Sequence, residues 1–156
     1  MADGFIRAEV KGLKELEAAL KALPPEIAGR SGGPLRAGVR KMGDFMALEI
    51  RRAAEKLPVS NVDGIDDYER TGRLARSVRV SRDQRAPQGT ERVWVKPRSP
   101  YYVPVEFGTE KMPARPFVRP TFEARYKLAI EVFRLELGKA IERAARKVAK
   151  LRASRG

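Results

Sequence analysis

The sequence predicts an α+β domain in which an antiparallel sheet of about three to four strands is packed by two or three helices, the last of them long. Long segments with apolar residues at helical spacing and short segments that alternate polar and apolar residues predict this class. With 156 residues, 42% of them hydrophobic, the chain can hold one core, so we expect a single domain over residues 1–156. Within it we expect a strand and helices over 1–58, strands and a proline-rich arm over 71–120, and a helix over 120–150.

The N-terminal part predicts one short strand and two helices. Residues 5–10 are compatible with a strand, and leucines spaced by three and four predict a helix that Pro24 and Pro25 end. Pro34 suits the first turn of a second helix, which Pro58 closes. Its apolar stripe comprises Leu35, Val39, Met42, Met46, Ile50, Ala53 and Leu57. Charges off the stripe (Arg36, Arg40, Lys41, Arg51 and Arg52) are typical of a solvated helix face.

Residues 59–70 predict a polar loop rich in aspartate. A calcium site is one interpretation of its acids, but their spacing does not reproduce the ligand register of a calcium loop. We therefore expect a surface turn.

Residues 77–81 and 92–96 alternate polar and apolar side chains and predict an antiparallel hairpin with a long loop over 83–90. Its valines (Val78, Val80, Val93 and Val95) are expected to face the core, with Arg79 and Trp94 on the other face. An outward tryptophan is a frequent interface anchor, and the alternative is that a helix covers this second face.

The segment 101–120 combines large apolar residues with prolines. We expect a strand over residues 102–107, a turn at Gly108 with positive φ, and then a stiff extended arm that forms neither a helix nor a central strand. Such an arm needs an apolar surface, and we expect Phe117 to anchor in a neighbouring copy. The carboxylate of Glu106 is expected to bind the side chain of Arg115 or Arg119, with Arg73 as another candidate.

Pro120 is expected to begin the C-terminal helix. Its apolar stripe comprises Phe122, Tyr126, Ala129, Ile130, Phe133, Leu137, Ala140, Ile141, Ala144 and Val148. Its basic end is a candidate contact with nucleic acid or an acidic partner through Arg143, Arg146, Lys147, Lys150 and Arg152.

The composition limits which classes of function are compatible with the chain. The chain has no histidine and no cysteine, which removes the commonest general base, the commonest zinc ligand and disulfides. No nucleotide-binding glycine motif is present, and we expect neither an enzyme nor a cofactor or metal site. No apolar run is long enough to cross a membrane, so we expect a soluble, intracellular chain without membrane contact. The net charge of +13 fits a nucleic-acid, anionic-lipid or acidic protein partner, or a solvated surface.

Three motifs occur in order: Thr71-Gly72-Arg73-Leu74 with Ser77, then Tyr102 with Glu106-Phe107-Gly108-Thr109, then residues 112–117 (MPARPF) with Arg119-Pro120. This series resembles the tail-completion, or head–tail joining, proteins of long-tailed bacteriophages and prophages, the minor tail protein Z-like family. The segment GLKELEAALKALP near the N-terminus is also similar to the usual opening of that family.

The resemblance implies a structural virion protein that forms a ring of six copies at the head-proximal end of a phage tail. Its implied partners are other copies of itself, a tail terminator or tail tube protein, a head-side connector or adaptor, and genome DNA in the lumen. A tail terminator or head-closure ring is the alternative within the same joint, and a basic nucleic-acid-binding protein is the alternative from another class. We place the contacts between copies at Thr71, Arg73, Leu74, Trp94, Tyr102, Glu106, Phe107, Gly108, Thr109, Met112, Pro113, Arg115, Pro116, Phe117 and Arg119.

Overall fold

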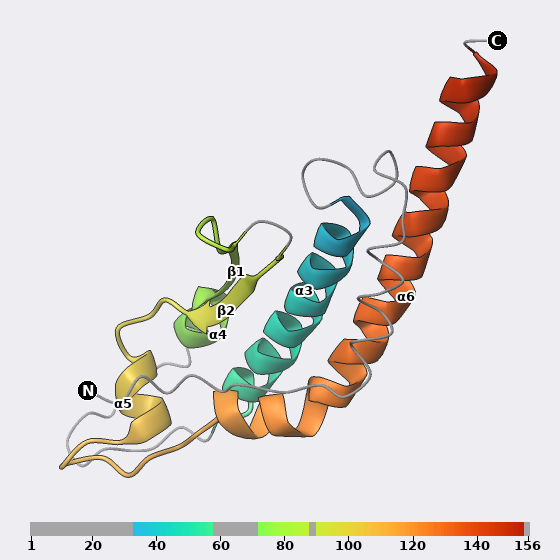
Figure 1. Cartoon of the computed structure of the whole chain (residues 1–156). Helices are drawn as coiled ribbons and strands as arrows, with labels where there is room; N and C mark the ends of the chain where they lie inside the picture. The colour runs from blue at the N-terminus through green and yellow to red at the C-terminus, as the bar shows by residue number, and fades with distance from the viewer. Residues whose placement is uncertain (1–32, 58–71, 88–89, 155–156) are drawn as a thin grey trace.

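A computed structural model describes residues 33–57, 72–87 and 90–154 of the chain. These residues form four helices and two strands: α3 (Gly33–Glu55), α4 (Arg73–Ser77), β1 (Val78–Arg82), β2 (Val93–Pro97), α5 (Tyr102–Phe107) and α6 (Val118–Ala153). Figure 1 shows α3 between the β1–β2 hairpin on one side and α6 on the other. The described part is therefore mixed α and β with a long C-terminal helix, as the sequence predicts.

Two helices with apolar stripes pack along each other. The buried residues between α3 and α6 include Met46, Ala129, Phe133, Leu137 and Ala140, which belong to the two predicted stripes. A glycine lets the helices approach, because a Cβ on Gly38 would lie 2.9 Å from the Phe133 ring. The Arg125 Nε atom of α6 lies 3.0 Å from a carboxylate oxygen of Glu49 in α3. Both predicted helices are thus confirmed, and they bury their stripes largely against each other.

The hairpin covers another face of α3. Strands β1 and β2 pair antiparallel, with Val80 opposite Val95. Gly43 of α3 lies under the hairpin, since a Cβ there would meet side-chain atoms of Val93 at 3.0 Å and Val80 at 3.1 Å. The side chain of Trp94 is 37% exposed on the other face of the strand. The predicted hairpin and the direction of its valines are therefore confirmed, whereas the side chain of Arg79, expected on the face of Trp94, reaches the side of the hairpin that meets α3.

A second cluster of buried residues lies where the C-terminal part of α3 meets the hairpin and the proline-rich arm. It contains Ala47, Ile50, Val78 and Phe117, and Phe117 is 3% exposed. The expectation that Phe117 anchors in a neighbouring copy is therefore wrong. The prolines do keep the arm extended, but the turn at Gly108 reverses the chain, and the Arg115 N–H donates to the Val105 carbonyl at 2.7 Å. The arm thereby returns Phe117 to the core of its own chain.

Two further expectations need correction. Residues 102–107 form the helix α5 rather than a strand, so the sheet has two strands within the described residues instead of three to four. Pro104 is compatible with α5 because the first N–H groups of a helix have no partner within the helix. Helix α6 begins at Val118, two residues before Pro120. The predicted strand over 5–10, the first predicted helix and the aspartate-rich loop lie outside the described residues.

None of the helices in the described part of the chain is long and apolar enough to span a membrane.

We predict opposite effects for the same substitution at two helical glycines. In Gly38→Ala the new Cβ meets Phe133, and overpacking costs about 1–3 kcal/mol, more than the roughly 1 kcal/mol gained from helix propensity. Gly138→Ala in α6 meets no atom within 4 Å and should raise the free energy of unfolding by about 1 kcal/mol. Urea unfolding of both variants measures the difference. Equal stabilisation by both would contradict the close packing of α3 and α6.

Phe117→Ala should lower the free energy of unfolding by about 3–5 kcal/mol, as truncation of large core side chains does. Phe107→Ala is the matched control, because Phe107 is 52% exposed and should change stability by less than about 1 kcal/mol. Thermal and urea unfolding of the two purified variants test this. A Phe117→Ala variant that unfolds like the wild type would indicate that Phe117 packs against a neighbouring molecule and not in the core of its own chain.

Candidate functional site

The carboxylate of Glu106 holds the first turn of α6. Its Oε2 atom accepts the backbone N–H groups of Phe117 at 2.8 Å and Val118 at 3.0 Å, and its Oε1 atom accepts that of Arg119 at 3.1 Å. Glu106 is 5% exposed. The first N–H groups of a helix lack intrahelical acceptors, and the N-terminal end of the helix dipole favours a negative charge. Glu106 therefore caps a helix that begins twelve residues later in the chain, at Val118.

This arrangement corrects the role expected for Glu106. We expected a bidentate bond to an arginine side chain, whereas Arg119 is bound through its backbone N–H. Both carboxylate oxygens accept hydrogen bonds, so Glu106 is held as a structural acceptor. Glu110 is exposed.

A tight turn after α5 brings the capped helix back to Glu106. Gly108 has φ 77° and ψ 177°, as predicted for a positive-φ turn, and a Cβ there would lie 2.8 Å from the Ala114 nitrogen. The Thr109 N–H donates to the Met112 carbonyl at 2.8 Å, and the Met112 N–H donates back at 3.3 Å. The loop between α5 and α6 is thus closed by its own backbone.

Aromatic rings connect the core to the surface at α5. The ring of Tyr102 meets Phe117 edge-on at a centroid distance of 6.3 Å and Phe107 at 6.4 Å. Burial raises the pKa of the Tyr102 hydroxyl, and the negative charge of Glu106 raises it further. Because Phe107 packs against a ring that is itself packed against the core, its position is held even though half of its surface is exposed.

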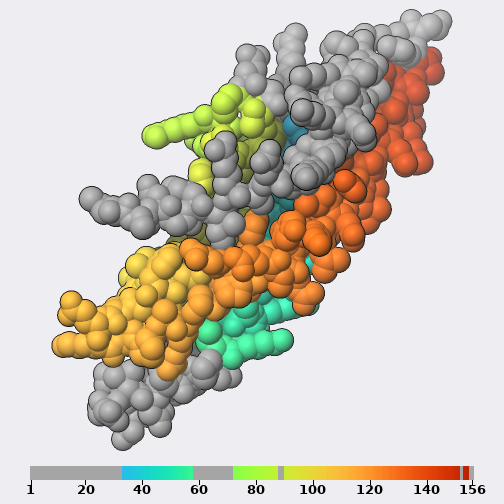
Figure 2. Space-filling view, turned by 60° about the horizontal axis from the view of Figure 1, so that its bottom comes forward, coloured from blue at the N-terminus to red at the C-terminus, as the bar shows by residue number. Residues whose placement is uncertain are grey.

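Three large apolar side chains are exposed on and beside this short helix. Tyr101 is 54% exposed, Val103 56% and Phe107 52%. We call Tyr101, Val103 and Phe107 the α5 surface. In Figure 2 the yellow and orange atoms of the segment that contains them lie on the outside of the molecule, at the left of the view. Large apolar side chains exposed close together in one short segment are typical of a contact with another protein.

The structure distributes the other predicted interface residues between interior and surface. Leu74, Tyr102, Gly108, Met112 and Arg115 are half-buried, and Leu74 packs against the core cluster. Arg73, Trp94, Phe107, Thr109, Pro113, Pro116 and Arg119 are exposed. Thr71 lies outside the described residues. The turn and arm that we predicted as a contact therefore expose part of their side chains and use the rest to build the core.

The basic end of α6 is exposed. Arg143, Arg146, Lys147 and Lys150 all lie at the surface, whereas the side chain of Arg152 is outside the described part. The Arg143 Nε atom donates to the Lys139 carbonyl at 3.2 Å, and a nitrogen of Arg146 lies 3.9 Å from a carboxylate oxygen of Glu142. Exposed ion pairs at such distances contribute little to stability, so these charges are accessible to an anionic partner.

Tyr101 and Val103 are not among the contact residues that the sequence predicts, because residues 102–107 are predicted to form a strand. A helical signal was present: Tyr102, Val105 and Glu106 are spaced by three and four, and these residues face the core. Among the described residues, no group of three or more acidic side chains is placed to hold a metal ion.

We predict that Glu106→Ala destabilises the protein by roughly 2–4 kcal/mol, because it removes charge-assisted hydrogen bonds and leaves helix N–H groups without an acceptor. Glu106→Gln keeps one carbonyl acceptor and should lose less. Glu110→Ala serves as the control, because it removes an exposed carboxylate from the loop that follows α5.

Urea unfolding measures the loss, and amide hydrogen exchange at Phe117, Val118 and Arg119 locates it. Unchanged exchange at these amides in Glu106→Ala would rule out the cap.

Comparison of the chain with protein-family models, with curated proteins and with solved structures finds no match. The resemblance to tail-completion proteins therefore depends on the three motifs in the sequence, and the structural role of their residues described above is independent of it.

Proposed function

We propose that this chain is a structural subunit of a phage tail, with six copies forming a ring at the head-proximal end of the tail tube. The observation that carries the proposal is the α5 surface, which lies within the motif series of the tail-completion proteins. A tail-joining subunit needs a rigid contact surface more than a reactive site, and this surface combines large apolar area with a fixed backbone.

The contact is proposed to be heterologous. In a closed ring, one surface of each copy meets a different surface of the next copy. The α5 surface supplies one side of that contact, together with the exposed prolines at 113 and 116. Stiff proline-containing loops lose little conformational entropy on binding, which favours association.

The packing beneath α5 supports this assignment. The cap on α6, the Gly108 turn and the Tyr102 ring hold α5 against the core. A surface that is ordered before binding avoids part of the entropy cost of association, about 0.5–1.5 kcal/mol for each side chain that would otherwise be immobilised.

The proposed partners beyond the ring are a tail tube or tail terminator protein on one side and a head-side connector on the other. The basic end of α6 is proposed to face the genome DNA in the lumen or an acidic surface of a partner, through nonspecific charge contacts. The proposed location is the virion neck, after assembly in the host bacterium.

Phe107→Ala should weaken self-association without unfolding the monomer. Truncating a central aromatic residue of an interface costs at least about 2 kcal/mol of binding, which is roughly a thirtyfold weaker association. Leu135→Ala is the matched control, because Leu135 is 60% exposed on α6, away from the α5 surface.

Sedimentation of both variants over a concentration series, with and without tail tubes, gives the association constants, and counting joined particles in complementation gives the function. A strict monomer under all conditions, or equal assembly by both variants, would overturn the proposal.

A further inference from the structure

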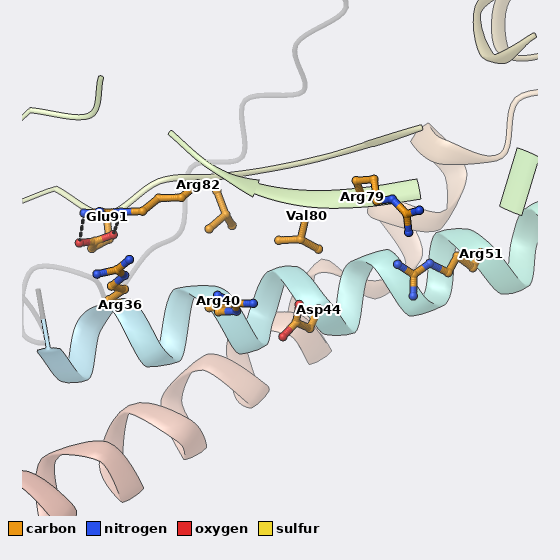
Figure 3. Close-up of a pocket in the computed structure, with 9 residues that line it drawn as sticks. Arg36, Arg40, Asp44, Arg51, Arg79, Val80, Arg82 and Glu91 are labelled. Atoms are coloured by element: carbon orange, nitrogen blue, oxygen red, sulfur yellow. Dashed lines mark hydrogen bonds and ion pairs between the residues drawn. The ribbon is translucent and has the colours of Figure 1, made fainter. Parts of the chain in front are cut away.

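An arginine-rich cavity lies between α3 and the hairpin, away from the α5 surface. It has a volume of about 280 Å³ and is lined by Arg36, Arg40, Asp44, Arg51, Arg79, Val80, Arg82, Glu91 and Val93. In Figure 3 the side chains of Arg36 and Arg51 extend from α3 toward the hairpin, those of Arg40 and Asp44 lie close to the helix, and Arg79 extends from β1 toward α3. Five arginines and two carboxylates leave three positive charges in one space.

Two of the five arginines, Arg82 and Arg51, already bind acceptors of the protein itself. Arg82 and Glu91 form a two-pronged pair, with Nη2 2.9 Å from Oε1 and Nε 3.1 Å from Oε2. Arg51 donates from Nη2 to the Val78 carbonyl at 2.9 Å, which fixes its guanidinium but leaves its charge uncompensated. The Arg51 contact ties α3 to β1, and the Arg82–Glu91 pair joins the two arms of the hairpin, so both contacts order the walls of the cavity.

The remaining arginines lack such partners. Within the described residues, no hydrogen bond or ion pair joins the guanidinium groups of Arg36, Arg40 or Arg79 to another side chain. They come from two different elements, and Arg36 and Arg40 are one helical turn apart on the face of α3 that meets the hairpin. Like charges are thus gathered around one space, an arrangement that an anion would stabilise.

We propose that this cavity binds a small phosphate-bearing anion. Guanidinium forks match phosphate oxygens bidentately, and a phosphate group offers three acceptor oxygens and about −1.5 to −2 charges, enough to engage arginines from both walls together. Binding pockets for drug-sized ligands span about 300–1,000 Å³, so this cavity suits a phosphate or pyrophosphate rather than a folded peptide segment.

The phosphate can come from a free anion or from a nucleic-acid end or backbone that reaches into the cavity. The proposal does not depend on the proposed ring, because the cavity lies within a single chain and does not use the α5 surface.

Pyrophosphate is the probe, titrated calorimetrically into the full-length protein at 150 mM salt. We expect saturable binding at one site per chain. Arg40→Gln and Arg79→Gln should each weaken it about tenfold or more, the value of one charge-assisted hydrogen bond. Arg40→Lys keeps the charge but loses the fork and should give an intermediate affinity.

Arg134→Gln changes the net charge equally at an exposed position of α6 and should change the affinity by less than about twofold. Removing the acid from the cavity by Asp44→Asn should strengthen binding, whereas Glu131→Gln, an exposed acid of α6, should not. Both arginines replaced are exposed, and unchanged melting temperatures verify that each variant is folded.

Competition by a short DNA duplex identifies the source of the phosphate. Displacement of pyrophosphate by DNA, with the binding of both ligands weakened in Arg79→Gln, supports a nucleic-acid phosphate. Saturable pyrophosphate binding without competition supports a free anion. Absence of saturable binding, equal weakening by Arg134→Gln, or tighter binding of a glutamate-rich peptide at the same residues would overturn the proposal.

Discussion

The carboxylate of Glu106 is the interaction on which the arrangement around α5 depends. By accepting three backbone N–H groups of residues 117–119, it caps the start of α6, joins α5 to that helix, and holds the backbone of Phe117, whose ring lies in the core. A buried carboxylate is costly unless its oxygens are satisfied, and the free N–H groups of a helix start satisfy both. One side chain thus joins a local turn to the longest helix of the chain.

Helix α3 is the second organising element, because it packs against α6 on one face and against the hairpin on another. Glycine at 38 and at 43 lets both neighbours approach its backbone. The cost of a glycine within a helix, about 1 kcal/mol, is tolerated because close packing recovers dispersion energy on both faces. Beside these contacts, arginines of α3 and β1 line a cavity between the helix and the hairpin.

Helix α5 and the proline-rich arm divide their side chains between the interior and the surface. Phe117 and Tyr102 build the core, while Phe107 and the prolines at 113 and 116 are exposed. The same backbone constraints therefore contribute to stability and to a preordered surface. For the proposed ring, substitution of a core residue of the motif series should therefore lower the free energy of unfolding, whereas substitution of a contact residue should not.

The sequence by itself determined the elements whose signals are local. These signals depend only on residues within about four positions of one another. They are the apolar stripes of α3 and α6, the alternation of the hairpin and the positive φ of Gly108. Only the tertiary structure decided the partners of Glu106, the burial of Phe117 and the clustering of arginines from α3 and β1. The reason is physical: periodicity predicts which face of an element is apolar, whereas hydrogen bonds and charge clusters between residues far apart in the chain depend on how those elements pack.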